Sequence, residues 1–242
     1  MHFNLVTIFP ELIQDFVSYG IISNAISKNK LSISTWNPRE FSEDKNGRLD
    51  DRPYGGGPGM VLQPEPIIKT VDAIKKENET YVIYMAPHGK ALNQQKLLEL
   101  SQKENLTIIS GRYEGIDNRV EAACIDEVCS IGDYILNGGE LPALILLEGI
   151  SRLIDGVLGD DNSLLEESFN NGLLEFPQYT RPEKSKYGNV PEVLLSGNHS
   201  EIKRWRLKES LRRTISVRPE LIDTRKLTSE ERELIDEIKA EG

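Results

Sequence analysis

The sequence lacks the features that define several large classes of protein. It has two cysteines, Cys124 and Cys129, and three histidines, too few and too scattered for a zinc module with four ligands. No apolar run approaches the roughly 18 residues of a membrane-spanning helix. The first residues read as a strand without a basic leader, so we expect no signal peptide. We therefore expect a cytoplasmic protein with reduced, structural cysteines.

Several catalytic signatures are also missing. No G-x-G-x-x-G motif follows the first predicted strand, which argues against a dinucleotide-binding fold and against a conventional Rossmann methyltransferase. The sequence has no G-x-x-x-x-G-K-[ST] motif, so a P-loop NTPase is disfavoured. It also has no G-x-S-x-G motif, the commonest signature of serine hydrolases.

Charge is distributed unevenly along the acidic chain. The net charge of −10 divides into −12 for residues 1–180, +6 for 181–226 and −4 for 227–242. A basic block of this kind suits a polyanion such as RNA, although a solvated helix face would have the same composition. On the helix predicted for about 200–215, Arg206 and Arg213 lie nearly opposite an apolar face of Leu207, Leu211 and Ile215.

The first 155 residues alternate short apolar runs with helical patterns, which predicts an α/β domain with a mostly parallel sheet. The predicted strands are 3–8, 31–35, 81–85, 106–110 and 127–131, and the predicted helices are 11–27, 65–77, 92–103, 116–124 and 140–154. The periodicity fails from Gly156 to about Asn198, which reads as loop and linker. Helices resume at two capping patterns, Asn198 with Glu201 and Thr228 with Glu231.

Three predicted strands run into glycine-bearing loops, at 86–89, 111–115 and 132–139. Ligands of open parallel sheets lie beyond the carboxyl ends of the strands, so these loops predict a site for a flat, polar small molecule. Glycines that only make tight turns are the alternative. A fourth cluster, 50–60 (DDRPYGGGPGM), is too rich in glycine and proline for regular structure, and we interpret it as a loop laid against a ligand or a base.

Two further features carry charge. Glu166 and Glu167 lie within the long linker, where two carboxylates are more often solvated than catalytic. Arg152 lies late on the predicted helix 140–154, where an arginine usually makes a surface ion pair.

Together these segments resemble the bacterial tRNA (guanine-N1)-methyltransferases of the TrmD type, in the SPOUT superfamily. The resemblance covers nearly the whole chain and rests on five stretches in order: 50–60 (DDRPYGGGPGM), 111–117 (GRYEGID), 130–143 (SIGDYILNGGELPA), 172–182 (GLLEFPQYTRP) and 193–206 (VLLSGNHSEIKRWR).

The resemblance implies the fold and the partners. Residues 1–159 would form a SPOUT α/β domain with a deep trefoil knot, an exception to the rule that chains do not thread loops. Residues 160–172 would be a linker, and 173–242 a helical domain that binds tRNA. The family forms homodimers with composite active sites and methylates the guanine at position 37, in the anticodon stem-loop.

The resemblance also implies the site. S-adenosylmethionine would be bound by residues of the three knot loops: Pro87, Gly111, Glu114, Ile131, Gly132, Asp133, Tyr134, Ile135, Leu136, Gly138, Gly139 and Pro142. The expected tRNA contacts are Gly55, Gly56, Gly57, Gly59, Arg181, Arg206 and Arg213.

The catalytic pair implied by the resemblance is Glu167 and Arg152. Glu167 would be the general base that removes the proton from guanine nitrogen 1, although the family more often has Asp there. Arg152 would stabilise the charge that builds on the guanine oxygen. No metal ligands are assigned, and a part for Mg²⁺ is left open by acidic pairs such as Asp160-Asp161.

Two other functions remain open at this stage. One is a SPOUT methyltransferase with a different RNA target, and the other is a tRNA-binding module without catalysis. A 2′-hydroxyl methyltransferase would not need the pattern from Glu167 to Pro182, and a silent module need not keep both Glu167 and Arg152.

Overall fold

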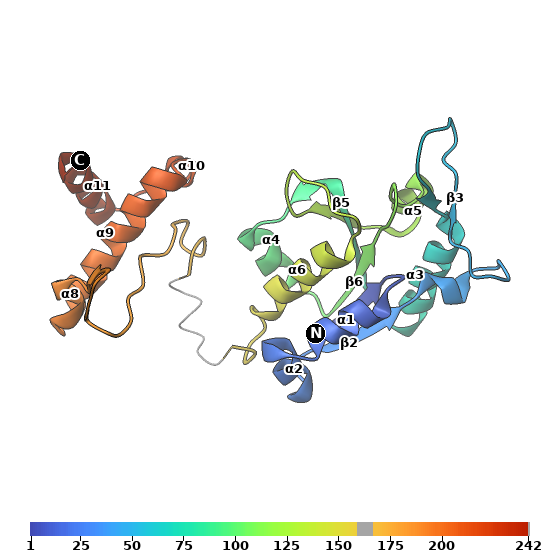
Figure 1. Cartoon of the computed structure of the whole chain (residues 1–242), viewed down its shortest axis with the longest axis horizontal. Helices are drawn as coiled ribbons and strands as arrows, with labels where there is room; N and C mark the ends of the chain where they lie inside the picture. Colours follow the sequence, from blue (N-terminus) through green and yellow to red (C-terminus); the bar gives the residue numbers. More distant parts are fainter. Residues whose placement is uncertain (159–166, 242) are drawn as a thin grey trace. The chain divides into compact units, whose positions relative to one another are not determined.

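The computed structural model describes residues 1–158 and 167–241, which divide into two compact units, Met1–Gly159 and Asp160–Gly242 (Figure 1). Residues 160–166 of the predicted linker 160–172 lie outside the described residues. Its last part, from Glu167 to Gly172, turns within the second unit, where the Phe169 amide donates to the Leu173 carbonyl.

The first unit is built around a parallel five-stranded sheet in the order β2-β1-β6-β5-β7. A short antiparallel pair, β3 and β4, stands apart from it. The strands are β1 (His2–Val6), β2 (Ser32–Trp36), β3 (Asp50–Asp51), β4 (Val61–Leu62), β5 (Tyr81–Ala91), β6 (Asn105–Ser110) and β7 (Glu127–Ser130). The helices are α1 (Pro10–Val17), α2 (Gly20–Ser27), the 3-10 helix η1 (Pro38–Phe41), α3 (Pro64–Glu77), α4 (Gln94–Leu100), α5 (Asn118–Cys124) and α6 (Glu140–Ser151).

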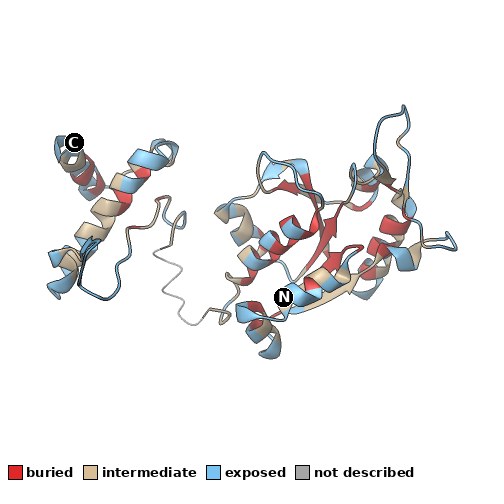
Figure 2. Cartoon of the chain, viewed as in Figure 1, coloured by how far each residue is buried: buried red, intermediate tan, exposed pale blue. Residues whose placement is uncertain are grey.

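Helices cover both faces of this sheet because successive strand residues point to opposite sides. Phe3 and Leu5 of β1 face α1, α2, α4 and α6, in a core that includes Ile13 and Leu147. Val6 of the same strand faces α3 and α5 on the other side. Figure 2 shows buried residues along the sheet and on the inner faces of these helices. The predicted α/β class with a mostly parallel sheet is therefore confirmed.

Three sequence expectations for the first unit are wrong. The single helix predicted for 11–27 is two, α1 and α2, separated at a glycine with positive φ, Gly20 (φ 69°). The helix predicted for 92–103 covers only Gln94–Leu100, and Asn93 caps its start by accepting from the Lys96 amide. The segment 86–89, expected to be a loop after its strand, lies inside β5.

That segment of β5 is an irregularity in its pairing with β7. The register shifts between Met85 and Lys90, so the chain between them bulges and then pairs again. A Cβ on Gly89 would come within 2.6 Å of the backbone of Cys129, which explains the glycine at the point of closest approach.

The second unit is mostly helical. It contains a short hairpin, β8 (Lys184–Ser185) with β9 (Gly188–Asn189), and the helices α8 (Glu192–Leu195), α9 (His199–Val217), α10 (Glu220–Asp223) and α11 (Ser229–Glu241). Its core joins Leu173 to Leu211 of α9 and to Leu234 and Ile235 of α11. The predicted capping pattern at Thr228 is confirmed, because its hydroxyl accepts from the Glu231 amide while the Glu231 carboxylate accepts from the Thr228 amide.

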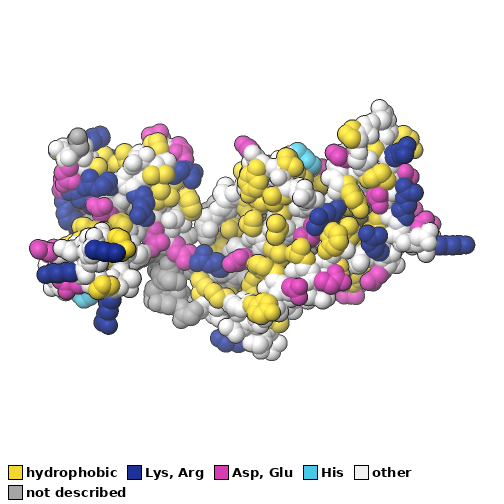
Figure 3. Space-filling model, viewed as in Figure 1, with side chains coloured by type: hydrophobic (Ala, Val, Ile, Leu, Met, Phe, Trp, Pro, Cys, Tyr) yellow, Lys and Arg dark blue, Asp and Glu magenta, His cyan; other side chains and the backbone are white. Residues whose placement is uncertain are grey.

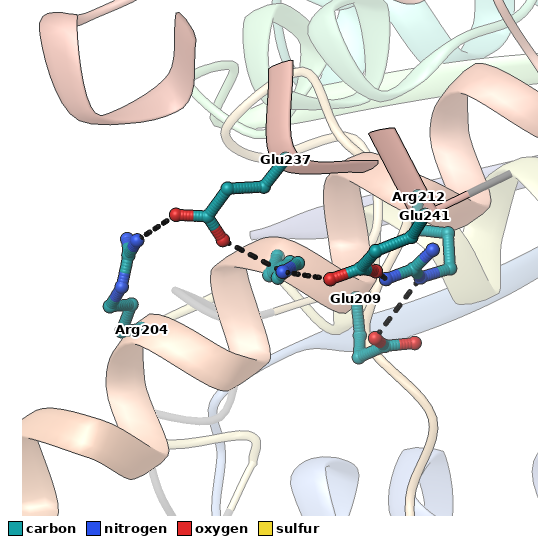
Figure 4. Close-up of polar contacts among 6 residues, drawn as sticks. Arg204, Glu209, Arg212, Glu237 and Glu241 are labelled. Atoms are coloured by element: carbon teal, nitrogen blue, oxygen red, sulfur yellow. Dashed lines mark hydrogen bonds and ion pairs between the residues drawn. The ribbon is translucent and has the colours of Figure 1, made fainter. Parts of the chain in front are cut away.

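The basic residues of α9 lie on two sides of the helix. Arg204, Lys208 and Arg212 point toward α11 and form ion pairs with Glu237 and Glu241 (Figure 4). These three cations stabilise the packing of α9 on α11, so the +6 block is not uniformly available to a polyanion.

Candidate functional site

A cavity of about 410 Å³ lies at the carboxyl ends of β6 and β7, beside the irregular middle part of β5. It is lined by parts of the three segments 84–88, 111–116 and 129–139, together with residues of α5 and α6. The predicted cofactor-binding residues that line it are Pro87, Gly111, Glu114, Ile131, Gly132, Tyr134, Ile135, Leu136, Gly138, Gly139 and Pro142. Asp133 is absent from this lining in the described part of the chain.

Backbone contacts bring two of the loops together. The Gly139 amide donates to the Gly111 carbonyl at 2.8 Å, and Arg112 forms an antiparallel bridge with Gly138. A Cβ on Gly139 would lie 2.8 Å from the Gly111 nitrogen, which only glycine avoids. Close approach of the two loops therefore explains why glycines stand there, and the cavity wall between them is largely main chain.

An ion pair supports the loop from behind. The Arg112 guanidinium lies 2.8 Å from the carboxylate of Glu140, whose side chain is only 1% exposed. The Thr7 hydroxyl donates to the same carboxylate at 2.9 Å, and the Arg112 guanidinium also lies over the Phe9 ring. These contacts join the loop after β6, the start of α6 and the end of β1 into one support for residues 137–140.

Sequence reasoning missed other residues of the cavity wall. Tyr84 of β5 and Asn118 and Glu121 of α5 line it, and His88 contacts Glu121 through Nε2 at 2.9 Å. Burial raises the pKa of the Tyr84 hydroxyl, which therefore stays protonated in the space beside Gly111 and Gly115. Nothing in the alternation of β5 distinguishes Tyr84 from an ordinary core residue.

The lining is suited to a polar ligand with an apolar part. Tyr134, Ile135 and Leu136 are exposed on the loop after β7, and Ile135 is 79% exposed. Exposed apolar side chains at the rim of a cavity are typical of a ligand-binding surface. Burial raises the pKa of Cys129 to about 11, so this thiol at the cavity wall stays neutral.

The glycine-rich segment 52–60 joins β3 to β4 and projects from the body of the first unit (Figure 1). Its base is fixed to the cavity, because the Glu114 amide donates to the Met60 carbonyl and the Leu62 amide donates to the Gly115 carbonyl. A Cβ on Gly59 would overlap the Glu114 side chain. At the tip, Gly55, Gly56 and Gly57 have positive φ, and Tyr54 is 99% exposed. The loop thus extends from the cavity into solvent.

The two predicted catalytic residues lie in different units. Arg152 is the C-terminal capping residue of α6, half-buried, and its amide donates to the Glu148 carbonyl. Glu167 is half-buried at the start of the described part of the second unit, and its carbonyl accepts from the Asn170 amide. Glu166 and the pair Asp160-Asp161 lie outside the described residues.

The predicted tRNA contacts of the second unit are not a free basic face. The Arg206 guanidinium lies over the Phe176 ring, 4.7 Å from its centroid, and Arg213 donates to the Glu175 carbonyl at 2.9 Å. Both arginines therefore hold the segment 173–181 against α9, whereas arginines on a solvated helix face would extend into water. Arg181 is exposed.

Membrane-spanning helices and metal clusters are both absent from the described part of the chain. Among the helices within 1–158 and 167–241, none combines the length and apolar character needed to cross a bilayer. Within those same ranges, no three His, Cys, Asp or Glu side chains cluster as a metal site would require.

Comparisons with known proteins agree on one family. The family model for tRNA (Guanine-1)-methyltransferase TrmD matches residues 1–224. A tRNA (guanine-N(1)-)-methyltransferase of Vibrio vulnificus (strain YJ016) is 48% identical over 240 residues, covering 98% of this chain and 96% of the relative. Relatives with the same name from Pseudoalteromonas atlantica and Edwardsiella ictaluri are also 48% identical. They cover 99% and 100% of this chain, and 91% and 96% of their own lengths.

Proposed function

Because the chain belongs to the tRNA (guanine-1)-methyltransferase family TrmD, it methylates nitrogen 1 of a guanine in tRNA, and we propose that this guanine is at position 37, next to the anticodon. The observation that carries the proposal is the glycine-lined cavity of about 410 Å³ at the strand ends. The methyl donor is S-adenosylmethionine, and the enzyme acts in the cytoplasm, where tRNA is its substrate.

The cavity residues fit S-adenosylmethionine. Close loop approach at Gly111 and Gly139 leaves main-chain amides and carbonyls in the wall, which suits the edges of an adenine. Ile135 and Leu136 offer an apolar surface beside them. When bound, the donor supplies an electrophilic methyl group on a sulfonium. The knot of the SPOUT superfamily would hold it through these same loops.

Glu167 acts as the general base. Guanine nitrogen 1 carries a proton, so its lone pair becomes available only when that proton leaves. The proton moves to the Glu167 carboxylate, the nitrogen forms a bond to the methyl carbon, and the carbon–sulfur bond breaks with its electron pair on sulfur. The charges balance, because the negative carboxylate takes up the proton and the positive sulfonium becomes a neutral thioether.

Arg152 stabilises the transition state. Negative charge builds on the guanine oxygen as the nitrogen 1 proton leaves, and a fixed guanidinium favours that state over the neutral base. Arg152 caps the C-terminal end of α6, and Glu140 at the other end of this helix pairs with Arg112 at the cavity. The base must leave the anticodon-loop stack to react, which costs less in a loop than in a duplex.

The division into a donor-binding domain (1–159), a linker (160–172) and a tRNA-binding domain (173–242) is part of the same proposal. The glycine loop 55–59 and Arg181, Arg206 and Arg213 would contact the RNA. Arg206 and Arg213 would do so indirectly in part, by holding the segment 173–181.

The enzyme acts as a homodimer with composite active sites. An apolar face of the first unit supports this, where Phe16 of α1 and Leu141 and Ile145 of α6 are exposed on helices that pack together. Figure 3 shows hydrophobic side chains gathered on the visible face of this unit. Monomeric proteins rarely expose a large continuous apolar surface, and a second copy would cover it.

Mixing two inactive variants tests the composite site. If Arg152 and Glu167 of one site come from different protomers, a heterodimer of Arg152→Ala with Glu167→Gln has one intact site and one doubly altered site. Activity then returns on mixing to about a quarter of the wild-type value, by statistical pairing. A mixture with no more activity than its two components would contradict the arrangement.

The function itself is tested with transcripts of one tRNA that carry guanine or adenine at position 37. Transfer of a labelled methyl group from S-adenosylmethionine should occur only with guanine there, and digestion should release 1-methylguanosine. Equal transfer to both transcripts would reject the assigned target.

A further inference from the structure

A second cavity, of about 510 Å³, lies wholly within the second unit. One wall is formed by residues of the segment 176–183, and the others come from Val190, α8 and α9. The lining residues are Phe176, Pro177, Gln178, Tyr179, Thr180, Arg181, Glu183, Val190, Leu194, Leu195, Ile202, Trp205 and Arg206.

The walls of this cavity offer aromatic and cationic groups. Tyr179 is exposed and Trp205 half-buried, with ring centroids 6.3 Å apart and planes inclined by 55°. Arg206 lies over the ring of buried Phe176. Exposed aromatic rings beside arginines are the groups on which unstacked nucleobases lie in single-stranded nucleic acid complexes.

The surrounding charge favours an anionic partner. The lining contains two arginines and a single acid, Glu183. Lys184 and Lys186 are exposed on and beside β8, next to this wall. By contrast, Arg204, Lys208 and Arg212 of α9 form ion pairs with acids of α11 (Figure 4). The exposed cations Arg181, Lys184 and Lys186 at this wall suit phosphates.

The cavity is structurally continuous with Glu167. The Ser168 hydroxyl accepts from the Glu175 amide at 2.9 Å, and the Leu174 amide donates to the Thr214 hydroxyl at 2.9 Å. With the Arg213 bond to the Glu175 carbonyl, these contacts fix one segment on α9, with Glu167 at one end and the cavity wall at the other. An RNA whose reacting base is at Glu167 would thus have nearby nucleotides within reach of the cavity.

We propose that this cavity binds one unstacked nucleobase of the same RNA, outside the target guanine, with its face against Tyr179 and Trp205 and its flanking phosphate on Arg181. The inference rests on the proposed function, because it assumes that RNA lies at Glu167. A duplex cannot present a base in this way, so the cavity selects a loop over a stem. It therefore contributes to recognition of the anticodon loop rather than to methyl transfer.

Tryptophan fluorescence provides a direct test. The chain has two tryptophans, and Trp36 lies in β2 of the first unit, so Trp36→Phe leaves Trp205 as the single reporter. A stem-loop RNA that contains the target guanine should quench Trp205 fluorescence. Abasic sites are then placed one at a time in the loop, keeping the guanine. One such position should abolish the quench, and an unchanged quench at every position would overturn the proposal.

A matched pair of variants tests the energetic contribution. Tyr179→Ala should weaken stem-loop binding about five- to a hundredfold, the range measured for loss of base–aromatic stacking. Tyr179→Phe keeps the ring and should bind like wild type. Neither should change the affinity for S-adenosylhomocysteine, because the donor cavity lies in the first unit.

The outcomes separate this inference from the proposed function. Wild-type binding by Tyr179→Ala, with methylation intact, would reject the nucleobase cavity and leave the function standing. If the wild-type protein methylates no tRNA, the proposed function fails. Weak binding by Tyr179→Ala that Tyr179→Phe restores, with the abasic effect at one loop position, would support the cavity as a nucleobase site.

Discussion

Replacing Arg112 by Met should destabilise the first unit and loosen the donor cavity. The side chain keeps its length but loses the cation that faces Glu140 at 2.8 Å. The Glu140 carboxylate, 1% exposed, would then be a buried charge whose remaining donor is the Thr7 hydroxyl. Met also cannot maintain the cation–π contact with Phe9. The loop 137–140 would lose its support from both sides.

The size of the effect follows from burial. Removing one partner of a fully buried ion pair typically costs about 3–5 kcal/mol. Arg112 is 24% exposed and Thr7 still donates to the carboxylate, so we expect a lower value, about 2–3 kcal/mol. For a domain of this size, that lowers the midpoint of thermal unfolding by roughly 5–10 °C.

Arg119→Met is the matched control. Arg119 also pairs with a carboxylate at 2.8 Å, that of Asp117, but its side chain is 70% exposed. The expected cost is below about 1 kcal/mol. The assay is thermal unfolding of the full chain with and without S-adenosylhomocysteine, combined with calorimetry of ligand binding. Arg112→Met should lose both stability and ligand affinity.

A double-mutant cycle with Glu140→Gln decides whether the two residues act as a pair. Adding Glu140→Gln to Arg112→Met removes the stranded charge, so the double variant should be more stable than Arg112→Met alone. Equal stability of Arg112→Met and Arg119→Met, or simple additivity in the cycle, would refute the reasoning.

Three other predictions follow from single contacts. Gly139→Ala should abolish S-adenosylhomocysteine binding in calorimetry, because its Cβ would lie 2.8 Å from the Gly111 nitrogen; retained affinity would show that the two loops can separate. Burial raises the pKa of Cys129 to about 11, so alkylation should be slow at pH 8 and slower still with ligand bound, as peptide mapping would detect. Lys208 lowers the pKa values of the Glu237 and Glu241 carboxyls below 4.5. The stability that these ion pairs give to the folded protein should therefore be present above that pH and lost as the pH falls through the lowered values. Acid unfolding of Lys208→Met at the same pH as wild type would contradict this.

The sequence predicted the sheet of the first unit well because its strands are apolar runs between clear breaks. It failed at Gly20 and at 86–89, where the backbone departs from the regular pattern of its segment. Nothing local marks Gly20 as the break between α1 and α2, since isolated glycines also occur within helices. The irregular pairing of 86–89 depends on the approach of β7 to Gly89, which a single segment cannot reveal.

For the candidate site, too, some residues could be predicted from the sequence and others could not. Glycine loops after three strands predict a ligand edge, because parallel strands end on one side of a sheet. The residues behind that edge, Glu140 and Thr7, were not predicted, because their pairing joins positions far apart in the sequence. Arg206 and Arg213 were expected on a basic face, but contacts with 173–181 hold them, and only the folded unit shows this.

The most direct test of proton removal by Glu167 is single-turnover methylation of tRNA by wild type and Glu167→Gln across a range of pH. Gln keeps the size of the side chain but cannot accept the proton, so the rate at pH 7 should fall by about 10²–10⁴-fold, the usual contribution of a general base. The rate of Glu167→Gln should recover as pH rises toward ionisation of guanine nitrogen 1. A defect of the same size at every pH would contradict the account and assign Glu167 to positioning alone.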